Sequence, residues 1–110
     1  MIIMTKEQKI KDILLKLELE LKDRDMWGGD ERRPHESALN SKEPFCIDTL
    51  EFHQWLEYIL IRKMHQIIDD KLELPGSVQI YPMAVEYYRG QWGEYRSLID
   101  ILRQFDEIFA

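Results

Sequence analysis

Polar side chains of the types that bind anions or transfer protons gather in residues 27–35, which read W-G-G-D-E-R-R-P-H. Carboxylates and an imidazole can exchange protons near neutral pH, and an arginine can hold a carboxylate or a phosphate through two hydrogen bonds. Loops that stand on a rigid scaffold often carry function, but Asp is also a common turn former. The segment is therefore either part of a binding site or a pinned turn. Its candidate binding residues are Asp30, Glu31, Arg33 and His35.

A second polar group recurs at helical spacing further along the chain. Gln54, Tyr58, Arg62, His65 and Asp69 fall within about 80° of one another when a helix turns by about 100° per residue. Arg62 can hold an anion, and Asp69 can orient His65 as an acid or a base. The alternative is a solvated helix face with ordinary i,i+4 pairs. If His35 approaches this stripe, the two groups form one site, and its helical candidates are Tyr58, Arg62, His65 and Asp69.

Other site chemistries find little support. His35, His53, His65 and Cys46 show neither paired metal-ligand spacing nor an H-E-x-x-H motif. Cys46 with a histidine seven residues later lacks a supporting signature for a nucleophile. The glycines at 28 and 29 follow a predicted helix instead of preceding one, so they form no phosphate loop. We expect no catalytic residue, no metal and no cofactor.

The composition predicts one domain over residues 1–110. The chain is 45% hydrophobic with a net charge of −6, and its only adjacent basic pairs are Arg32-Arg33 and Arg62-Lys63. A phosphate backbone needs more clustered cations, so direct nucleic-acid binding is disfavoured. No apolar run approaches the roughly 20 residues that span a bilayer, and the N-terminal segment is unlike a secretory signal. Together with the single cysteine, this predicts a soluble cytoplasmic protein that does not associate with membranes.

Two long helices should position the candidate residues. A capping box of Thr5 and Gln8 begins the first, and its apolar residues recur at helical spacing up to the glycines at 28 and 29. The second has a capping signal at Asp48 and Glu51 and contains neither Gly nor Pro over residues 49–71.

Two further helices complete the predicted fold. Pro82 begins a short one that reaches about Arg89, and an apolar period marks another from Glu94 almost to the chain end. Four amphipathic helices with short connections indicate an all-α fold, a four-helix up-and-down bundle. The exception is the long loop of residues 28–47 between the first two helices. We expect it to be ordered, anchored by apolar residues that include Trp27, Leu39, Phe45 and Ile47.

A set of residues spread over nearly the whole chain carries a family resemblance. It consists of Trp27, Asp30, Glu31, Pro34, His35, Pro44, Phe45, Asp48, Thr49, Trp55, Leu56, Met64, His65, Asp69, Lys71, Leu74, Pro75 and Gly76. With these residues the sequence resembles the YqcC-like family of small bacterial proteins. The resemblance implies a bundle of four near-parallel helices and an association with tRNA pseudouridine synthase. It implies no role for Cys46.

The sequence argues against pseudouridine synthesis by this chain itself. Such enzymes use an Asp nucleophile, typically in an R-L-D context on a large mixed α/β scaffold, and this chain contains no R-L-D. The first hypothesis is therefore a non-catalytic accessory module with a protein partner, for which a tRNA-modifying enzyme is the expected class. The second is a small-molecule-binding protein or weak hydrolase. Its site lies between the 28–47 loop and the second helix, where Asp30, Glu31, His35 and His65 supply acid and base. A third hypothesis, direct tRNA contact, has the least support because the chain is acidic.

Overall fold

A computed structural model describes residues 4–110, and all regular secondary structure within them is helical. This confirms the predicted all-α class. Residues 1–3, part of the segment judged unlike a secretory signal, lie outside the described residues. The helices in chain order are α1 (Lys6–Asp23), α2 (Glu36–Leu39), η1 (Pro44–Cys46), α3 (Phe52–Trp55), η2 (Leu56–Ile61), α4 (Arg62–Asp69), α5 (Tyr81–Tyr87) and α6 (Arg96–Ile108). None of the helices in residues 4–110 has the length and apolar composition needed to cross a bilayer.

Helix α1 begins where the sequence predicts but ends earlier. The Thr5 side chain accepts the N–H of Gln8, and the Gln8 side chain accepts the N–H of Thr5, so the capping box is formed. At the other end Asp25 adopts a left-handed conformation (φ +59°), and the Met26 N–H donates to the Leu21 carbonyl at 2.9 Å. This six-to-one bond is the closing bond of a Schellman motif. The helix therefore ends at Asp23, and the predicted stop at the glycines is wrong.

The second predicted helix exists as one continuous rod made of α3, η2 and α4. It begins at Phe52 with Glu51 as the N-cap, so the predicted start near residue 49 is wrong. Asp48 instead accepts a hydrogen bond from the Ser41 hydroxyl. At the far end Lys71 is left-handed (φ +54°), and the Leu72 N–H donates to Ile67 at 2.9 Å, a second Schellman closure.

The middle of the rod, η2, is a π-helix of six residues. A π-turn closes i to i+5 and so holds one residue more than an α-turn. The predicted polar stripe crosses this segment, and its residues differ in exposure to solvent. Tyr58 is 5% exposed, whereas Arg62 lies in the exposed class.

Helices α5 and α6 lie close to the predicted bounds and are tied to each other. The Asp106 carboxylate on α6 accepts the N–H groups of Ile80 and Tyr81, both at 2.8 Å, and so caps the start of α5. These donors have no intrahelical partner at a helix N-terminus. Pro82, in the first turn of α5, lacks such a donor.

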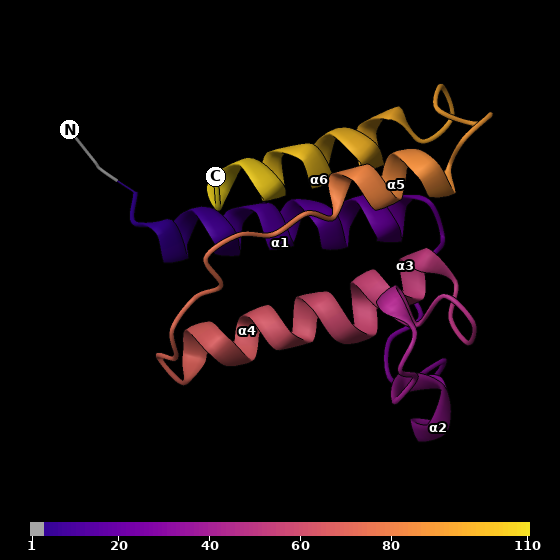
Figure 1. The fold of residues 1–110 in the computed structure, drawn as a ribbon, viewed down its shortest axis with the longest axis horizontal. Helices are drawn as coiled ribbons and strands as arrows, with labels where there is room; N and C mark the ends of the chain where they lie inside the picture. Colours follow the sequence, from indigo (N-terminus) through magenta and orange to yellow (C-terminus); the bar gives the residue numbers. More distant parts are fainter. Residues whose placement is uncertain (1–3) are drawn as a thin grey trace.

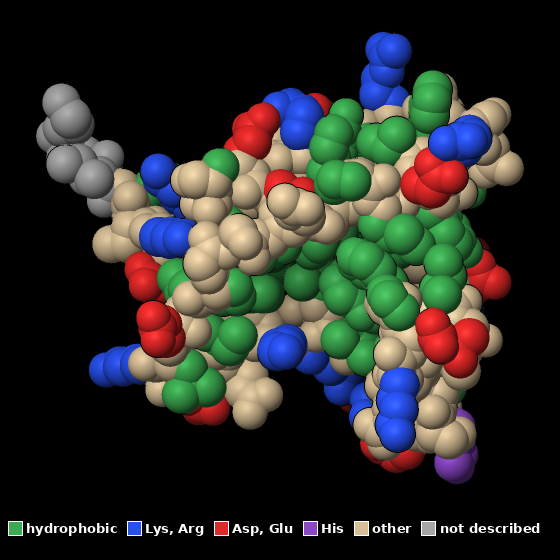
Figure 2. Space-filling model, in the orientation of Figure 1, with side chains coloured by type: hydrophobic (Ala, Val, Ile, Leu, Met, Phe, Trp, Pro, Cys, Tyr) green, Lys and Arg blue, Asp and Glu red, His purple; other side chains and the backbone are tan. Residues whose placement is uncertain are grey.

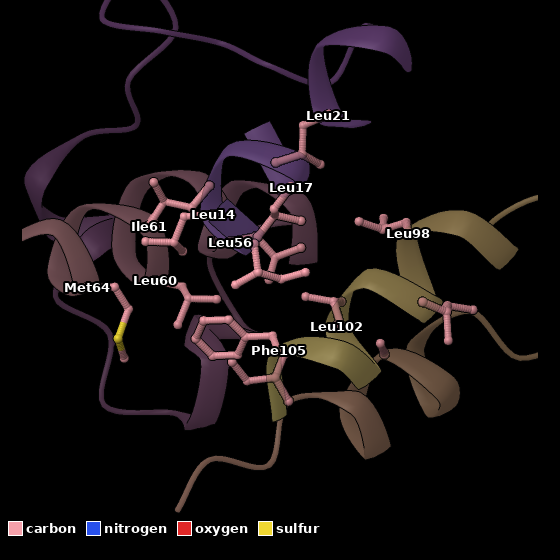
Figure 3. Close-up of a cluster of buried hydrophobic side chains, with 14 of the residues drawn as sticks. Leu14, Leu17, Leu21, Leu56, Leu60, Ile61, Met64, Leu98, Leu102 and Phe105 are labelled. Atoms are coloured by element: carbon pink, nitrogen blue, oxygen red, sulfur yellow. The ribbon is translucent and has the colours of Figure 1, made fainter. Parts of the chain in front are cut away.

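Most of the core comes from α1, the rod and α6 (Figure 3), and α5 adds Ala84. Leucines from α1, the rod and α6 meet there, and Phe105 lies among them with 1% exposure. In Figure 1 α1 runs between the rod and the α5–α6 pair, and the chain reverses direction from α1 to the rod, from the rod to α5 and from α5 to α6. The labelled core residues in Figure 3 are Leu14, Leu17, Leu21, Leu56, Leu60, Ile61, Met64, Leu98, Leu102 and Phe105.

The connection between α1 and the rod contains the short helices α2 and η1. The Phe45 ring lies 4.7 Å from the Trp55 ring and 6.2 Å from the Phe52 ring, measured between centroids. Cys46 and Leu50 are buried. Ile47 is 51% exposed, so the prediction that it anchors the loop is wrong. The aromatic contacts of Phe45 therefore attach this connection to the start of the rod.

Candidate functional site

A buried acid joins the segment after α1 to the middle of the rod. The Glu57 side chain is 2% exposed, and its two carboxylate oxygens accept the N–H groups of Gly28 and Gly29 at 2.8 and 2.7 Å. The Tyr58 hydroxyl donates to the Gly29 carbonyl at 2.7 Å. Both backbone donors and both carboxylate oxygens are thus satisfied, as a buried charge requires. We call these four residues the glycine clamp.

The clamp explains why two glycines follow Trp27. Gly29 has φ +63°, a backbone conformation that residues with a Cβ adopt only at an energetic cost. At Gly28 a Cβ would fall on the Tyr58 hydroxyl and would lie 2.9 Å from the Cβ of Arg32. Only glycine fits between the loop and the rod at this point.

The sequence pattern does not identify Glu57 as the residue that holds the loop. A signal was present, because Glu57 lies three, four and seven residues before Leu60, Ile61 and Met64, all of which are buried. An acid within an apolar helix face needs a partner when the face is buried. The partner is backbone some 29 residues away, which periodicity does not identify.

A pocket of about 130 Å³ opens beside the clamp. His53 on the rod faces it, and the Nδ1 atom of this histidine is buried without a hydrogen-bond partner among residues 4–110. Burial lowers the pKa of His53, while the nearby carboxylates of Glu51 and Glu57 act in the opposite direction. His53 is therefore held toward its neutral form. The complete lining is Asp25, Met26, Gly28, Arg32, His53, Gln54, Glu57 and Tyr58.

The structure brings three of the sequence-predicted binding residues together. Arg62 on α4 forms an ion pair with Asp30 in the loop at 3.1 Å, and its guanidinium lies 5.4 Å from the centre of the Tyr58 ring. The two predicted groups therefore meet, through Asp30 instead of through His35. The side chains of Arg62 and Asp30 are 47% and 94% exposed, so the pair itself adds little stability.

Of the other predicted residues of the loop, His35 and Arg33 have local partners. The His35 Nδ1 accepts the Ser37 N–H at 3.1 Å and so caps α2, and Arg33 pairs with Glu36 at 2.8 Å. Glu31 is exposed and forms no hydrogen bond or ion pair with another described residue. Within residues 4–110, none of these three side chains forms a hydrogen bond or an ion pair with the rod.

On the rod, His65 and Asp69 are exposed, and within residues 4–110 no hydrogen bond joins them. None of Asp30, Glu31, His35 and His65 lines the pocket beside the clamp. A general acid or base must lie within hydrogen-bond reach of its target or of a bridging water. In the described chain, no three His, Cys, Asp or Glu side chains gather closely enough to hold a metal ion. The arrangement is therefore a charged surface on a rigid support, beside a small polar pocket.

Comparison with known proteins places the chain in a family. Residues 9–108 match the DUF446 family model, which is described as tRNA pseudouridine synthase C. The chain is 32% identical to the uncharacterised protein YqcC of Escherichia coli (strain K12), over 97% of this chain and 96% of that protein. It is 26% identical to an uncharacterised protein of Haemophilus influenzae, over 89% of this chain and 90% of that protein. A match to tRNA pseudouridine synthase C of Pectobacterium carotovorum is 34% identical over 67% of this chain but only 19% of that protein.

The fold agrees with a solved relative. The solution NMR structure of Escherichia coli YqcC superposes with a TM-score of 0.82, covering 97% of this chain and 90% of that one. The two sequences are 32% identical in this comparison. Family match, identity over nearly full length and fold agree, and the chain therefore belongs to the YqcC-like DUF446 family of small helical proteins.

Proposed function

We propose that this protein is a non-catalytic accessory module that binds a tRNA pseudouridine synthase through protein–protein contacts. One observation carries the proposal: 74 residues of the Pectobacterium tRNA pseudouridine synthase C are 34% identical to this chain and make up 19% of that protein. Joining two modules in one chain raises their effective concentration for each other. In our proposal, this protein corresponds to one of these modules. It binds the synthase as a separate chain.

The scaffold in this proposal is a four-helix up-and-down bundle with an ordered 28–47 loop lying across one end. The glycine clamp supports it, because two hydrogen bonds to Glu57 and one from Tyr58 hold the loop against the rod. A loop that is already ordered loses less conformational entropy when a partner binds. The loop is thus suited to recognition.

The proposed contact surface is the set of loop and rod residues predicted from the sequence, Asp30, Glu31, Arg33, His35, Tyr58, Arg62, His65 and Asp69. Tyr58 is buried and acts by holding the loop, whereas the other seven lie in the exposed class. Charges of both signs on such a surface favour a partner with the complementary arrangement. The Asp30–Arg62 ion pair joins the loop part of this surface to its rod part.

The test is calorimetric titration of the purified protein with purified tRNA pseudouridine synthase C of the same organism, both treated with RNase. We expect a saturable complex. Arg62→Glu should weaken it by about tenfold or more, because it removes a cation and places a like charge beside Asp30. Arg89→Glu is the matched control, because Arg89 is also exposed and paired with one acid, Glu86, but lies after α5.

The outcomes separate the parts of the proposal. No binding at micromolar concentrations would contradict the accessory module. Binding that is equally strong for Arg62→Glu and Arg89→Glu would contradict the surface alone. A complex that forms only before RNase treatment would favour direct tRNA contact.

A second candidate function, a small-molecule site between the loop and the rod, rests on the pocket of about 130 Å³ beside the clamp. The volume is below the roughly 300–1,000 Å³ of typical ligand sites, so its ligand would have only a few atoms. His53 and Arg32 offer a hydrogen-bonding nitrogen and a positive charge, in place of the His35 and His65 predicted from the sequence. A thermal-shift series with formate, acetate and phosphate tests this site. A shift that His53→Gln abolishes would support it, and no shift for any of the three would remove it.

A further inference from the structure

A groove of about 350 Å³ lies between α5 and α6, away from the residues of the glycine clamp. Its apolar lining comes from Tyr81 and Val85 on α5, Ile99 on α6 and Trp92 in the turns between them. In Figure 2 apolar side chains gather over α5 and the turn into α6, with Lys or Arg side chains at both ends. The volume lies within the range of small-molecule sites, which are mainly apolar with a few fixed polar groups.

Trp92 is held in place while its ring remains accessible. The indole Nε1–H donates to the Val85 carbonyl at 2.8 Å, which fixes the side chain against α5. The residue is nevertheless 51% exposed. An indole with its one polar atom satisfied and its ring open to the groove offers a flat surface on which another ring can stack.

Of the charged side chains that line the groove, all but one have a partner of opposite charge among residues 4–110. Arg103 donates to Asp100 and also to Glu107, and Gln104 adds a further bond to Asp100 at 2.9 Å. The hydrogen bonds from Arg103 and Gln104 hold the pKa of Asp100 below its usual value. Arg96 forms no hydrogen bond or ion pair with any residue in 4–110.

From this geometry we propose that the groove binds a small flat aromatic monocarboxylate, whose ring stacks on Trp92 and whose carboxylate pairs with Arg96. The apolar lining selects for the ring, and the one unmatched guanidinium selects for a single negative charge. A phosphate dianion fits less well because Asp100, also in the lining, would repel its second charge. The site is independent of the accessory function, since none of its residues belongs to the loop or the rod.

The test is an NMR titration of the full-length ¹⁵N-labelled chain with indole-3-acetate, and separately with its neutral analogue indole-3-acetamide. The acid should perturb the Trp92 indole N–H and the backbone amides of residues 96–103. Its affinity should exceed that of the amide by about tenfold, the effect of one charge-assisted hydrogen bond. Equal affinities for acid and amide, or perturbation of Trp27 or Trp55 in place of Trp92, would overturn the proposal.

Two variants complete the test. Arg96→Gln should lower the affinity for the acid to that for the amide and leave the amide unaffected. Arg89→Gln removes a neighbouring exposed arginine that does not line the groove, so it should bind the acid like the unmodified chain. If Arg96→Gln and Arg89→Gln weaken binding equally, the attraction is a general surface effect and the proposed pairing is wrong.

Discussion

The Glu57 carboxylate accepts the backbone N–H of Gly28 at 2.8 Å and so links two segments that lie 29 residues apart in the chain. One oxygen binds Gly28 and the other binds Gly29, so the side chain acts as a two-pronged acceptor for consecutive amides. The acid is 2% exposed, so both of its bonds to the loop lie within the packed part of the structure. The position of the loop therefore depends on this residue.

Glu57→Gln should destabilise the fold. The amide oxygen can still accept one of the two N–H groups, but the amide nitrogen would face the other donor and leave it unsatisfied. We expect a loss of about 1–3 kcal/mol in the free energy of unfolding, measured by urea denaturation. Glu73→Gln is the control, because Glu73 is exposed. Equal losses in the two variants would contradict the role of Glu57.

Gly28→Ala should also destabilise the fold. The loss of stability that it causes should be smaller in a chain that already carries Tyr58→Phe. The new Cβ would fall on the Tyr58 hydroxyl, whereas the next ring atom, Cζ, lies at 3.4 Å, an ordinary contact. Tyr58→Phe by itself loses the bond to Gly29, so the informative quantity is the coupling energy from the double-mutant cycle. Gly76→Ala is the control because a Cβ there meets no atom within 4 Å. A cycle that closes with no coupling would show that the two groups do not meet.

His53 should make the stability depend on pH. Burial lowers the pKa of His53 below its ordinary value of 6.5, so the folded chain binds this proton less readily than the unfolded chain. The contribution to stability is therefore fully present above pH 6.5 and is lost as the pH falls through the lowered folded-state pKa. Urea denaturation of the chain and of His53→Gln at about pH 8 and pH 5 should show a larger acid-induced loss in the unmodified chain. Parallel losses would contradict the prediction.

Tyr88→Phe should leave the stability unchanged or raise it by up to about 1 kcal/mol. The Tyr88 hydroxyl is buried and has no hydrogen-bond partner among residues 4–110, and burial raises its pKa. Its ring keeps its packing in the variant, stacked on Tyr95 with 4.1 Å between centroids. Thermal unfolding should show the opposite sign for Tyr58→Phe, whose hydroxyl is bonded. Clear destabilisation by Tyr88→Phe would indicate a partner for this hydroxyl.

Asp106→Ala should loosen the start of α5. The change removes the acceptor for the Ile80 and Tyr81 N–H groups, and losing a helix cap typically costs about 0.5–2 kcal/mol. Asp106→Asn keeps a side-chain oxygen in place and should cost less. Hydrogen exchange of the Ile80 and Tyr81 amides reports the change directly. Unchanged exchange in Asp106→Ala would mean that the carboxylate does not cap α5 in solution.

Features that depend on near neighbours were predicted well. The capping box of Thr5 and Gln8 needs only residues three apart, and the structure contains it. The apolar periods of the first and last long helices also give the residues that form the core, including Leu14 and Leu102. The missed helix end has a physical reason, because Asp25 takes the left-handed conformation usually found at glycine. The sequence pattern instead points to the glycines that follow.

The sequence by itself determined the helical class, the approximate helices and the loop and rod segments in which charged groups meet. Each of these depends on composition or on a repeat of three or four residues, which can be read along the chain. The tertiary structure alone decided that Asp30 pairs with Arg62, that Glu57 binds two glycine amides and that Asp106 caps α5. These contacts join residues 25 to 32 positions apart. At such separations the packing of α1, the rod and α6 selects each partner, because a polar group is satisfied by whichever group the fold brings within reach.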